Sequence, residues 1–313
     1  MNSRYVVDRQ SESSSSKPKW VEQLSYAQKQ RLRYFESRLI WEGLVNRNSI
    51  CDQFGVTPNH FTRDVRDYKR NFPNNIWYDV SARAYRPTPK FNAQFTVGDP
   101  EEYLSLLKLY SQNGYPTLMA ELGVHVLSDA IKKPQEKVNR QVLQAVLKSI
   151  REEHGLTISY QSFSREKPTS RTIWPHALAW SGDRWHARAY DENRNKYIDV
   201  VLSRIAEVFS SGHPPIEGLE DDMEWIEHEI INVIPNPILS ASQQRAIAME
   251  YGMDKVGNNY VWSVGMRRCL IPYFLYRYRL DIPTPERKRH GFPTQRIIVR
   301  DPDIVPKYAF PAD

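Results

Sequence analysis

SICDQFGVTPNHFTRDVRDYKRNFP, residues 49–73, reads as two short helices joined by a tight turn. Ser49 suits the start of the first helix, and Gly55 suits the left-handed conformation in which many helices end. Thr57 is a favourable N-cap, and Pro58 stands at the first helical position, where proline is well tolerated. The stretch therefore predicts a helix, a glycine-containing turn and a second helix that ends at Pro73.

The second helix has one apolar and one polar face. Phe61, Val65 and Tyr68 repeat at spacings of four and three, so they are expected to face inward. The residues left facing out are polar or basic: Asn59, His60, Thr62, Arg63 and Arg66. This arrangement is typical of a helix-turn-helix that reads DNA, and a helical hairpin used only for packing is the alternative.

The next segment, IWYDVSARAYRPTPKF at 76–91, alternates like a β-hairpin with its bend at 81–83. Such a hairpin would form the wing of a winged helix-turn-helix. Arg83 and Arg86 would lie within reach of phosphates.

The positive charge is concentrated near the N-terminus. Residues 1–90 hold 16 Lys and Arg against 9 Asp and Glu, whereas the remaining 223 residues hold 27 against 28. Charge confined to one terminal segment indicates that this segment meets a polyanion.

Length and composition predict several globular domains. The chain has 313 residues, 40% hydrophobic and 26% charged, with no apolar stretch near the roughly 20 residues of a membrane span. The N-terminal segment has no apolar signal-peptide core, so we expect a cytoplasmic protein without membrane contact. Cys51 and Cys269 are far apart in sequence and are expected to be buried free thiols.

Residues 99–154 look helical, with one helix over 101–113 and another that starts after Pro134. From Leu156 to Phe209 the periodicity changes to two, and four strands are expected at 156–163, 170–180, 183–191 and 196–209. Short strands at this spacing favour a small antiparallel sheet or a partly open barrel.

The strand around 184–194, RWHARAYDENR, places two arginines, a histidine and a tyrosine on one face. Neighbouring strands add more polar groups, and the set that accumulates is Tyr160, Arg171, His176, His186, Arg188, Ser203 and Arg204. Several cations on one sheet would repel one another unless an anion lay among them, so a nucleotide or short nucleic acid fits this face. A solvated sheet surface is the alternative, and register could place some of these residues on opposite faces.

Residues 213–230 are rich in proline and then acidic, and they read as a solvated linker. From 231 we expect a strand, a capped helix, another strand and an aromatic helix over CLIPYFLYRYRL. Tyr273, Phe274, Tyr276 and Tyr278 give this last unit enough aromatic surface to suggest a dimer contact.

The sequence lacks the common motifs for catalysis. GxGxxG, Walker A, HExxH and GxSxG do not occur, and neither do paired clusters with metal-ligand spacing. We therefore expect no enzyme activity, no catalytic residues, no metal site and no cofactor.

The order of these units resembles the WYL-domain transcriptional regulators, and within them the BrxR/CapW-like repressors associated with BREX and CBASS phage-defence loci. The most specific stretches are RTIWPHALAWSGDRWHARAYD, VLSRI, IPNPILSASQQRAIAMEYGM and CLIPYFLYRYRLD. The Trp-Tyr-Leu tripeptide that names the family is replaced here by Trp185-His186-Ala187.

The residue patterns and the resemblance together imply an α+β chain with six parts. These are a disordered arm (1–18), a winged helix-turn-helix domain (19–95), a helical connector (96–154), a ligand-sensing WYL domain with a small Sm-like antiparallel β-barrel (155–212), a linker (213–230) and a C-terminal α/β dimerisation extension (231–313). The resemblance also implies a ligand pocket formed by Tyr160, Ser162, Arg171, His186, Arg188, Ser203 and Arg204.

The sequence thus predicts a homodimeric repressor whose recognition helices dock on an inverted repeat of double-stranded DNA and are released by a nucleotide or nucleic-acid effector. The expected DNA contacts are Thr57, Asn59, His60, Thr62, Arg63, Arg66, Lys69, Arg70, Arg83 and Arg86. Asn59, His60 and Arg63 would meet base edges, and the last five would meet phosphates. The alternative function is a single-stranded nucleic-acid or nucleotide-binding accessory protein that modulates a partner enzyme.

Overall fold

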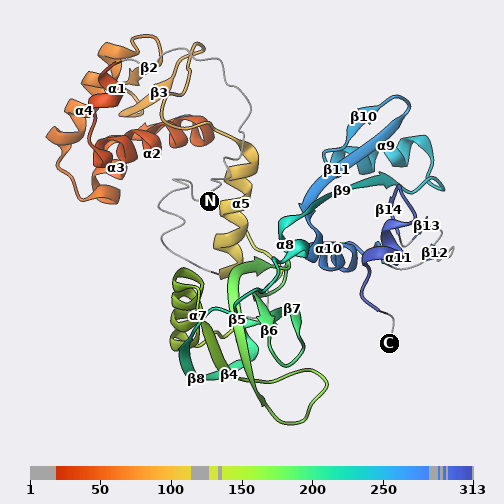
Figure 1. The fold of residues 1–313 in the computed structure, drawn as a ribbon. Helices are drawn as coiled ribbons and strands as arrows, with labels where there is room; N and C mark the ends of the chain where they lie inside the picture. The colour runs from red at the N-terminus through yellow and green to blue at the C-terminus, as the bar shows by residue number, and fades with distance from the viewer. Residues whose placement is uncertain are drawn as a thin grey trace. The chain divides into compact units, whose positions relative to one another are not determined.

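The computed structural model describes residues 19–113, 127–132, 136–281, 288–289, 292–293 and 295–311 (Figure 1). The chain divides into two compact units, 1–134 and 135–313. The expected arm at 1–18 and the 114–126 part of the expected connector lie outside the described residues. Within the described residues, no helix is long and apolar enough to cross a membrane.

The first unit contains the predicted helix-turn-helix and wing. Its helices are α1 (Lys19–Gln23), α2 (Tyr26–Glu42), α3 (Arg47–Phe54) and α4 (Pro58–Asn71), and its strands are β1 (Val45–Asn46), β2 (Ile76–Asp79) and β3 (Ala84–Pro87), paired in the order β1-β3-β2. Gly55 ends α3 with a φ of 62°, and the Thr57 hydroxyl accepts the His60 amide at the start of α4. These two local predictions are confirmed. The expected start at Ser49 is wrong, because the Asn46 side chain accepts the Asn48 amide and α3 begins two residues earlier, at Arg47.

Aromatic contacts hold the winged helix together. The Phe35 ring on α2 meets Phe61 and Tyr68 of α4 and Tyr85 of β3, with ring centroids 5.6–5.8 Å apart. Phe35, Phe61 and Tyr68 are fully buried. Phe35 thus packs both α4 and the wing strand β3 against α2.

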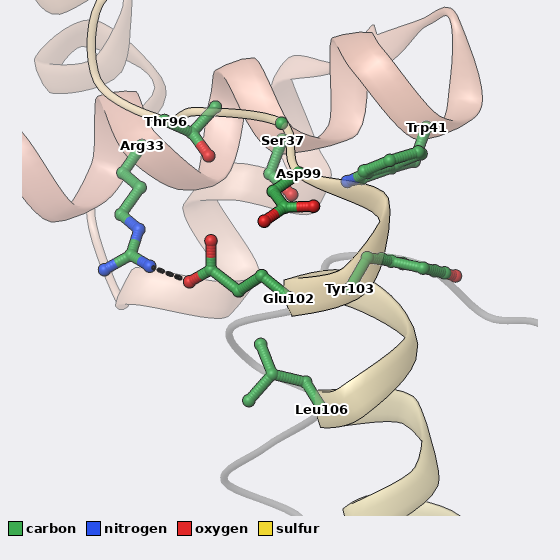
Figure 2. A pocket seen from close by; sticks show the side chains of 9 residues that line it. Arg33, Ser37, Trp41, Thr96, Asp99, Glu102, Tyr103 and Leu106 are labelled. Carbon is green, nitrogen blue, oxygen red and sulfur yellow. Dashed lines mark hydrogen bonds and ion pairs between the residues drawn. The ribbon is translucent and has the colours of Figure 1, made fainter. Parts of the chain in front are cut away.

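Helix α5 (Pro100–Asn113) follows the wing and packs on α2 within this unit (Figure 2). Arg33 and Glu102 form an ion pair at 3.0 Å, and the Trp41 and Tyr103 rings lie 4.7 Å apart. The pocket between these side chains has a volume of about 30 Å³, room for no more than one or two waters. It is therefore a packing crevice and not a ligand site.

The second unit begins with α7 (Arg140–Glu152), which covers a five-stranded antiparallel sheet. The strands are β4 (Gly155–Tyr160), β5 (Thr169–Trp180), β6 (Trp185–Asp191), β7 (Lys196–Val201) and β8 (Ile205–His213), in the order β7-β6-β5-β4-β8. The expected helix after Pro134 begins later, at Arg140, because the Asn139 side chain caps it by accepting the Gln141 amide.

The expected strand at 196–209 is two strands, because the 3-10 turn η1 (Leu202–Arg204) separates β7 from β8. This turn sends β8 to the far side of the sheet, next to β4. Among the described strands, β7 and β8 are the edges and do not pair with each other, so the sheet is open and the Sm-like barrel is not confirmed.

The C-terminal part has its own sheet and core. Its elements are β9 (His228–Pro235), α9 (Ala241–Glu250), β10 (Asp254–Val256), β11 (Asn259–Arg267), η2 (Arg268–Leu270), α10 (Ile271–Arg277), β12 (Lys288–Arg289), β13 (Phe292–Pro293), β14 (Ile297–Val299) and α11 (Ile304–Tyr308). The four-stranded sheet has the order β10-β11-β9-β14, and β12 pairs with β13. The predicted strand, capped helix, strand and aromatic helix are present, and Ser240 and Gln243 form a capping box at the start of α9.

Most of the aromatic surface expected to be free on α10 is used inside the chain. Phe274 and Tyr278 pack against Trp262, and Tyr273 contacts His186 of the first sheet. Of the four aromatic residues, Tyr276 is the one exposed large side chain, at 64%. The aromatic helix therefore packs mainly into the core of the C-terminal part, and Tyr273 joins it to the first sheet. Cys51 and Cys269 are buried free thiols, as expected.

Candidate functional site

The outer face of α4 carries the polar residues that the sequence predicted. Asn59, His60, Thr62, Arg63 and Arg66 are all exposed, while Phe61, Val65 and Tyr68 are buried. Thr57 is used as the N-cap, and the Thr62 hydroxyl donates to the Pro58 carbonyl at 2.7 Å. Asn59 and Arg63, the residues predicted to meet base edges, are exposed on the first turns of the helix.

A buried polar network lies behind the start of α4. The Arg31 guanidinium on α2 donates to Asp64 at 2.8 Å, and Gln28 donates to the same carboxylate at 3.2 Å. The Arg31 Nη2 also lies 3.1 Å from His60 Nε2, and the imidazole nitrogen accepts there because a guanidinium can only donate. Arg31 is buried and had no signal in the sequence that would separate it from other helix arginines.

The predicted phosphate contacts differ in availability. Lys69 is exposed at the C-terminal end of α4, and Arg83 is exposed at the tip of the wing, where it adopts a φ of 49°. Arg66 and Arg70 are mostly exposed and lie 3.6 and 3.8 Å from Asp67. Arg86 is bonded to Asp79 at 2.7 Å, so it is committed to holding the two wing strands together.

Glu36 joins the winged helix to the chain that leaves it. Its buried carboxylate accepts the amides of Gln94, Phe95 and Thr96, at 2.6–3.3 Å, and the Tyr68 hydroxyl at 2.7 Å. Burial raises the pKa of Glu36, and the hydrogen bonds from Tyr68 and the backbone oppose that rise. The helix that bears the recognition face and the segment that leads to α5 therefore share one acceptor.

The residues expected to form a ligand pocket on the first sheet divide between its two faces. Arg171 is paired with Asp191 at 2.9 Å, both are buried, and the guanidinium lies over the Tyr160 ring at 5.2 Å. Asp191 lies opposite Ile173, which belongs to the core beneath α7. Because side chains alternate along β6, His186 and Arg188 lie on the other face from Asp191.

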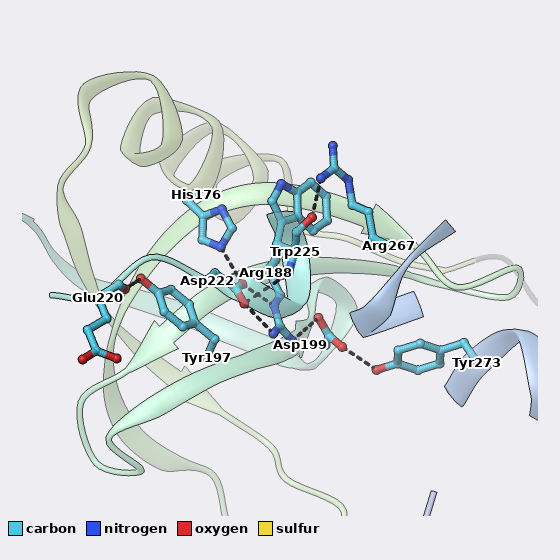
Figure 3. Close-up of polar contacts among 9 residues, drawn as sticks. All are labelled: His176, Arg188, Tyr197, Asp199, Glu220, Asp222, Trp225, Arg267 and Tyr273. Atoms are coloured by element: carbon cyan, nitrogen blue, oxygen red, sulfur yellow. Dashed lines mark hydrogen bonds and ion pairs between the residues drawn. The ribbon is translucent and has the colours of Figure 1, made fainter. Parts of the chain in front are cut away.

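On that other face, Arg188 is neutralised by carboxylates of the chain itself (Figure 3). Its Nε and Nη2 donate to the two oxygens of Asp222 at 2.6 and 2.9 Å, and its Nη1 donates to Asp199 at 3.3 Å. Asp199 also accepts the Tyr273 hydroxyl at 3.0 Å, and Asp222 lies 3.0 Å from His176 Nε2. Burial raises the pKa of Asp222, but the bonds from His176 and Arg188 outweigh it and hold that pKa at about 2.

The remaining predicted residues also have partners within the chain. His186 is buried against the Tyr273 ring, and burial lowers the pKa of His186. Ser203 donates to Glu136 at 2.9 Å, Arg204 lies over the Phe163 ring at 5.7 Å, and the buried Ser162 hydroxyl is 3.5 Å from that of Ser164.

Arg171 and Arg188 therefore do not need a foreign anion to balance their charge, because Asp191, Asp199 and Asp222 supply it. Asp222 is also not part of a solvated linker, since it is 6% exposed and caps the short helix α8 (Met223–Ile226). Sequence reasoning missed its role because nothing in the acidic run at 220–224 distinguishes the buried carboxylate from its exposed neighbours.

An open cleft of about 310 Å³ lies beside the Arg188 network. Its walls come from α7 and the residues just after it, from β5 and β7, and from the segment before β9. They include five aromatic or imidazole rings: His154, Trp174, His176, Tyr197 and Trp225. Asp221 and Asp222 also line it. Among the described residues, no group of three or more His, Cys, Asp or Glu side chains could hold a metal ion.

Comparison with known families matches three parts of the chain. The BrxR transcriptional regulator winged helix-turn-helix domain matches residues 27–109, the WYL domain matches 141–210, and the BrxR transcriptional regulator C-terminal dimerization domain matches 229–305. These ranges coincide with the winged helix and α5, with α7 and the five-stranded sheet, and with the C-terminal sheet.

Curated relatives extend across these units. Proteins named DNA-binding transcriptional repressor CapW, from Escherichia coli and Pseudomonas aeruginosa, are each 31% identical to this chain, over 82% of it and 84% of their own length. The protein of that name from Stenotrophomonas maltophilia is 28% identical over 77% of this chain and 79% of its own.

A solved structure, the proteasome accessory factor PafBC of Arthrobacter aurescens, covers 91% of this chain and 46% of its own at 16% identity and a TM-score of 0.28, a likeness too slight to carry a conclusion. The family matches and the CapW relatives confirm the expected resemblance: the chain belongs to the CapW and BrxR family of WYL-domain transcriptional regulators.

Proposed function

We propose that this chain is a cytoplasmic homodimeric repressor that binds a double-stranded operator with inverted repeats. It would control a phage-defence operon and leave the operator when an effector binds its WYL domain. The supporting observation is the outer face of α4, where Asn59 and Arg63 are exposed on the first turns of a capped helix beside a wing with Arg83 at its tip. The names of the CapW relatives and the match to a dimerization domain support the same function.

A mobility-shift experiment tests this function. Purified protein is mixed with duplex DNA from upstream of its own gene, with a shuffled duplex, and with each single strand. A repressor shifts the upstream duplex at two chains per site and at a lower concentration than the other probes. Preference for the single strands would instead support an accessory protein that binds single-stranded nucleic acid.

Arg63→Ala is expected to relax sequence preference. A bidentate arginine contact to guanine contributes about 1–3 kcal/mol of discrimination against the wrong base pair, and alanine removes it. Binding to the operator and to operators with single substitutions, measured by fluorescence anisotropy, should show one position at which discrimination disappears. Arg66→Ala is the matched control, since loss of a phosphate contact weakens all the duplexes alike; unchanged discrimination in Arg63→Ala would contradict the assignment.

Lys69→Ala is expected to weaken binding to specific and shuffled duplexes equally. Each phosphate contact releases about one counterion, so the slope of log K against log salt should become shallower by about one unit. Lys196→Ala removes one charge from an exposed position on β7 and serves as the control. An equal change of slope in both variants would mean that net charge, and not a contact at Lys69, sets the salt dependence.

A further inference from the structure

The contact between Arg188 and Asp222 has the form that a bound anion would take. A guanidinium with two parallel donors facing two carboxylate oxygens is the usual geometry for recognising a carboxylate or a phosphate. Arg188 is 6% exposed, and its third contact, to Asp199, is also internal. An anionic ligand can therefore use this arginine only in place of Asp222.

Asp222 neutralises Arg188 of β6, but it does not itself belong to the five-stranded sheet. It lies in the segment 214–227 between β8 and β9, which is hydrogen-bonded to the sheet at Pro214, Glu220 and Asp222. The Pro214 carbonyl accepts Trp174 Nε1 at 2.9 Å, the Glu220 carbonyl accepts the Tyr197 hydroxyl at 2.8 Å, and Asp222 accepts Arg188 and His176. The Asp222 carboxylate thus holds the end of this segment against the sheet (Figure 3).

The same segment is attached at its other end to the C-terminal sheet. The Trp225 carbonyl accepts an N–H of Arg267 on β11, and the Arg267 guanidinium lies 4.3 Å from the centre of the Trp225 ring. The Arg268 amide donates to the Glu227 carbonyl at 3.1 Å. A movement of α8 away from Arg188 would therefore act directly on β11, within the part that matches the dimerization domain.

The cleft gives a ligand access to this contact. Its volume of about 310 Å³ is at the lower end of the range for small-molecule sites. Asp222 forms part of its wall, and His176, which also touches Asp222, is about one-third exposed. The rings of Trp174, Tyr197 and Trp225 offer apolar surface to a flat ring. Arg188 is not part of the cleft wall, and its guanidinium becomes available to an anionic group only when Asp222 moves away.

We propose that Asp222 occupies the place of the anionic group of the effector, a small molecule with a flat aromatic ring and an anionic group such as a phosphate, which binds in this cleft and displaces Asp222 from Arg188. The inference rests on the proposed function, and it adds the chemical class of the effector and the route by which it reaches the dimerisation part. A ligand can shift the protein only by binding the two arrangements with different affinity, and here it gains Arg188 only when α8 is released.

The test uses the full-length wild-type dimer and the variants Asp222→Asn and Asp221→Asn. Asp221 lines the same cleft and is exposed without contacting Arg188, so it is the matched control. Adenosine monophosphate, adenosine and inorganic phosphate are titrated into each protein by calorimetry. We expect Asp222→Asn to bind adenosine monophosphate at least tenfold more tightly than wild type and Asp221→Asn do, and more tightly than it binds adenosine or phosphate.

A second measurement on wild type does not depend on the folding of a variant. Hydrogen exchange of the amides of 222–227 should become faster in saturating adenosine monophosphate, and exchange over 58–70 without DNA should not change. Equal nucleotide affinity in Asp222→Asn and wild type, or unchanged exchange at 222–227, would overturn the proposal. Failure of wild type to bind its operator without any nucleotide would instead count against the proposed function, so the two failures are distinguishable.

Discussion

Replacing Glu36 by alanine is expected to destabilise the winged-helix unit by about 3–5 kcal/mol. Three backbone amides and the Tyr68 hydroxyl lose their acceptor, and each buried donor left unsatisfied costs about 1–3 kcal/mol, partly offset because no carboxylate is then buried. Urea denaturation and hydrogen exchange over residues 20–96 measure the effect. Exchange should become faster at 94–96 and at the C-terminal end of α4.

Glu42→Ala is the matched control for Glu36. Glu42 lies on the same helix and forms a partly exposed ion pair with Arg38 four residues earlier, an interaction that contributes only about 0.3–0.5 kcal/mol. A loss of stability in Glu36→Ala as small as in Glu42→Ala would show that the shared acceptor does not hold the unit together.

Asp191→Ala is expected to destabilise the second unit by about 3–5 kcal/mol, because it leaves the guanidinium of Arg171 buried without its counter-ion. The Arg194 amide, which donates to Asp191 at 3.2 Å, also loses its acceptor. Thermal and chemical unfolding are the measurements, and Glu192→Ala, which changes the exposed neighbouring carboxylate, should stay within about 0.5 kcal/mol of wild type.

The double variant Arg171→Met with Asp191→Leu separates a structural pair from a ligand site. Replacing both members of a buried ion pair by apolar groups is often neutral, so much of the lost stability should return. If Asp191→Ala is instead as stable as wild type, the ion pair does not hold this unit together, and a ligand role for Arg171 is favoured over a structural one.

The winged helix was predictable from the sequence because its signals are local. Thr57 and Pro58 mark the start of α4, Gly55 marks the end of α3, and the period of the apolar residues decides which face of α4 is exposed. Each of these depends on a few neighbouring residues, and each was confirmed. The C-terminal elements were predictable for the same reason, as the capping box at Ser240 illustrates.

The polar arrangement of the first sheet was not predictable in the same way. It depends on a shift of register in β5 between Pro175 and Ala177, and such a shift cannot be predicted from the residue types of the strand. It also depends on Asp222, which lies 34 residues beyond Arg188 in the sequence and neutralises the Arg188 guanidinium through a tertiary contact. The residue types of the sheet indicated that anions were needed there, but not that the chain itself supplies them.

The shared acceptor at Glu36 has a mechanical consequence. Residues 94–96 are held to α2 by three amides, and the first turn of α5 is held to the same helix through Arg33–Glu102 and Trp41–Tyr103. A rotation of α5 is therefore transmitted to α2 and, through the contacts of Phe35, to α4 and its outer face. These helices are expected to move together as one rigid body. Because the carboxylate is buried, counterions screen this coupling far less than they screen a contact to phosphate.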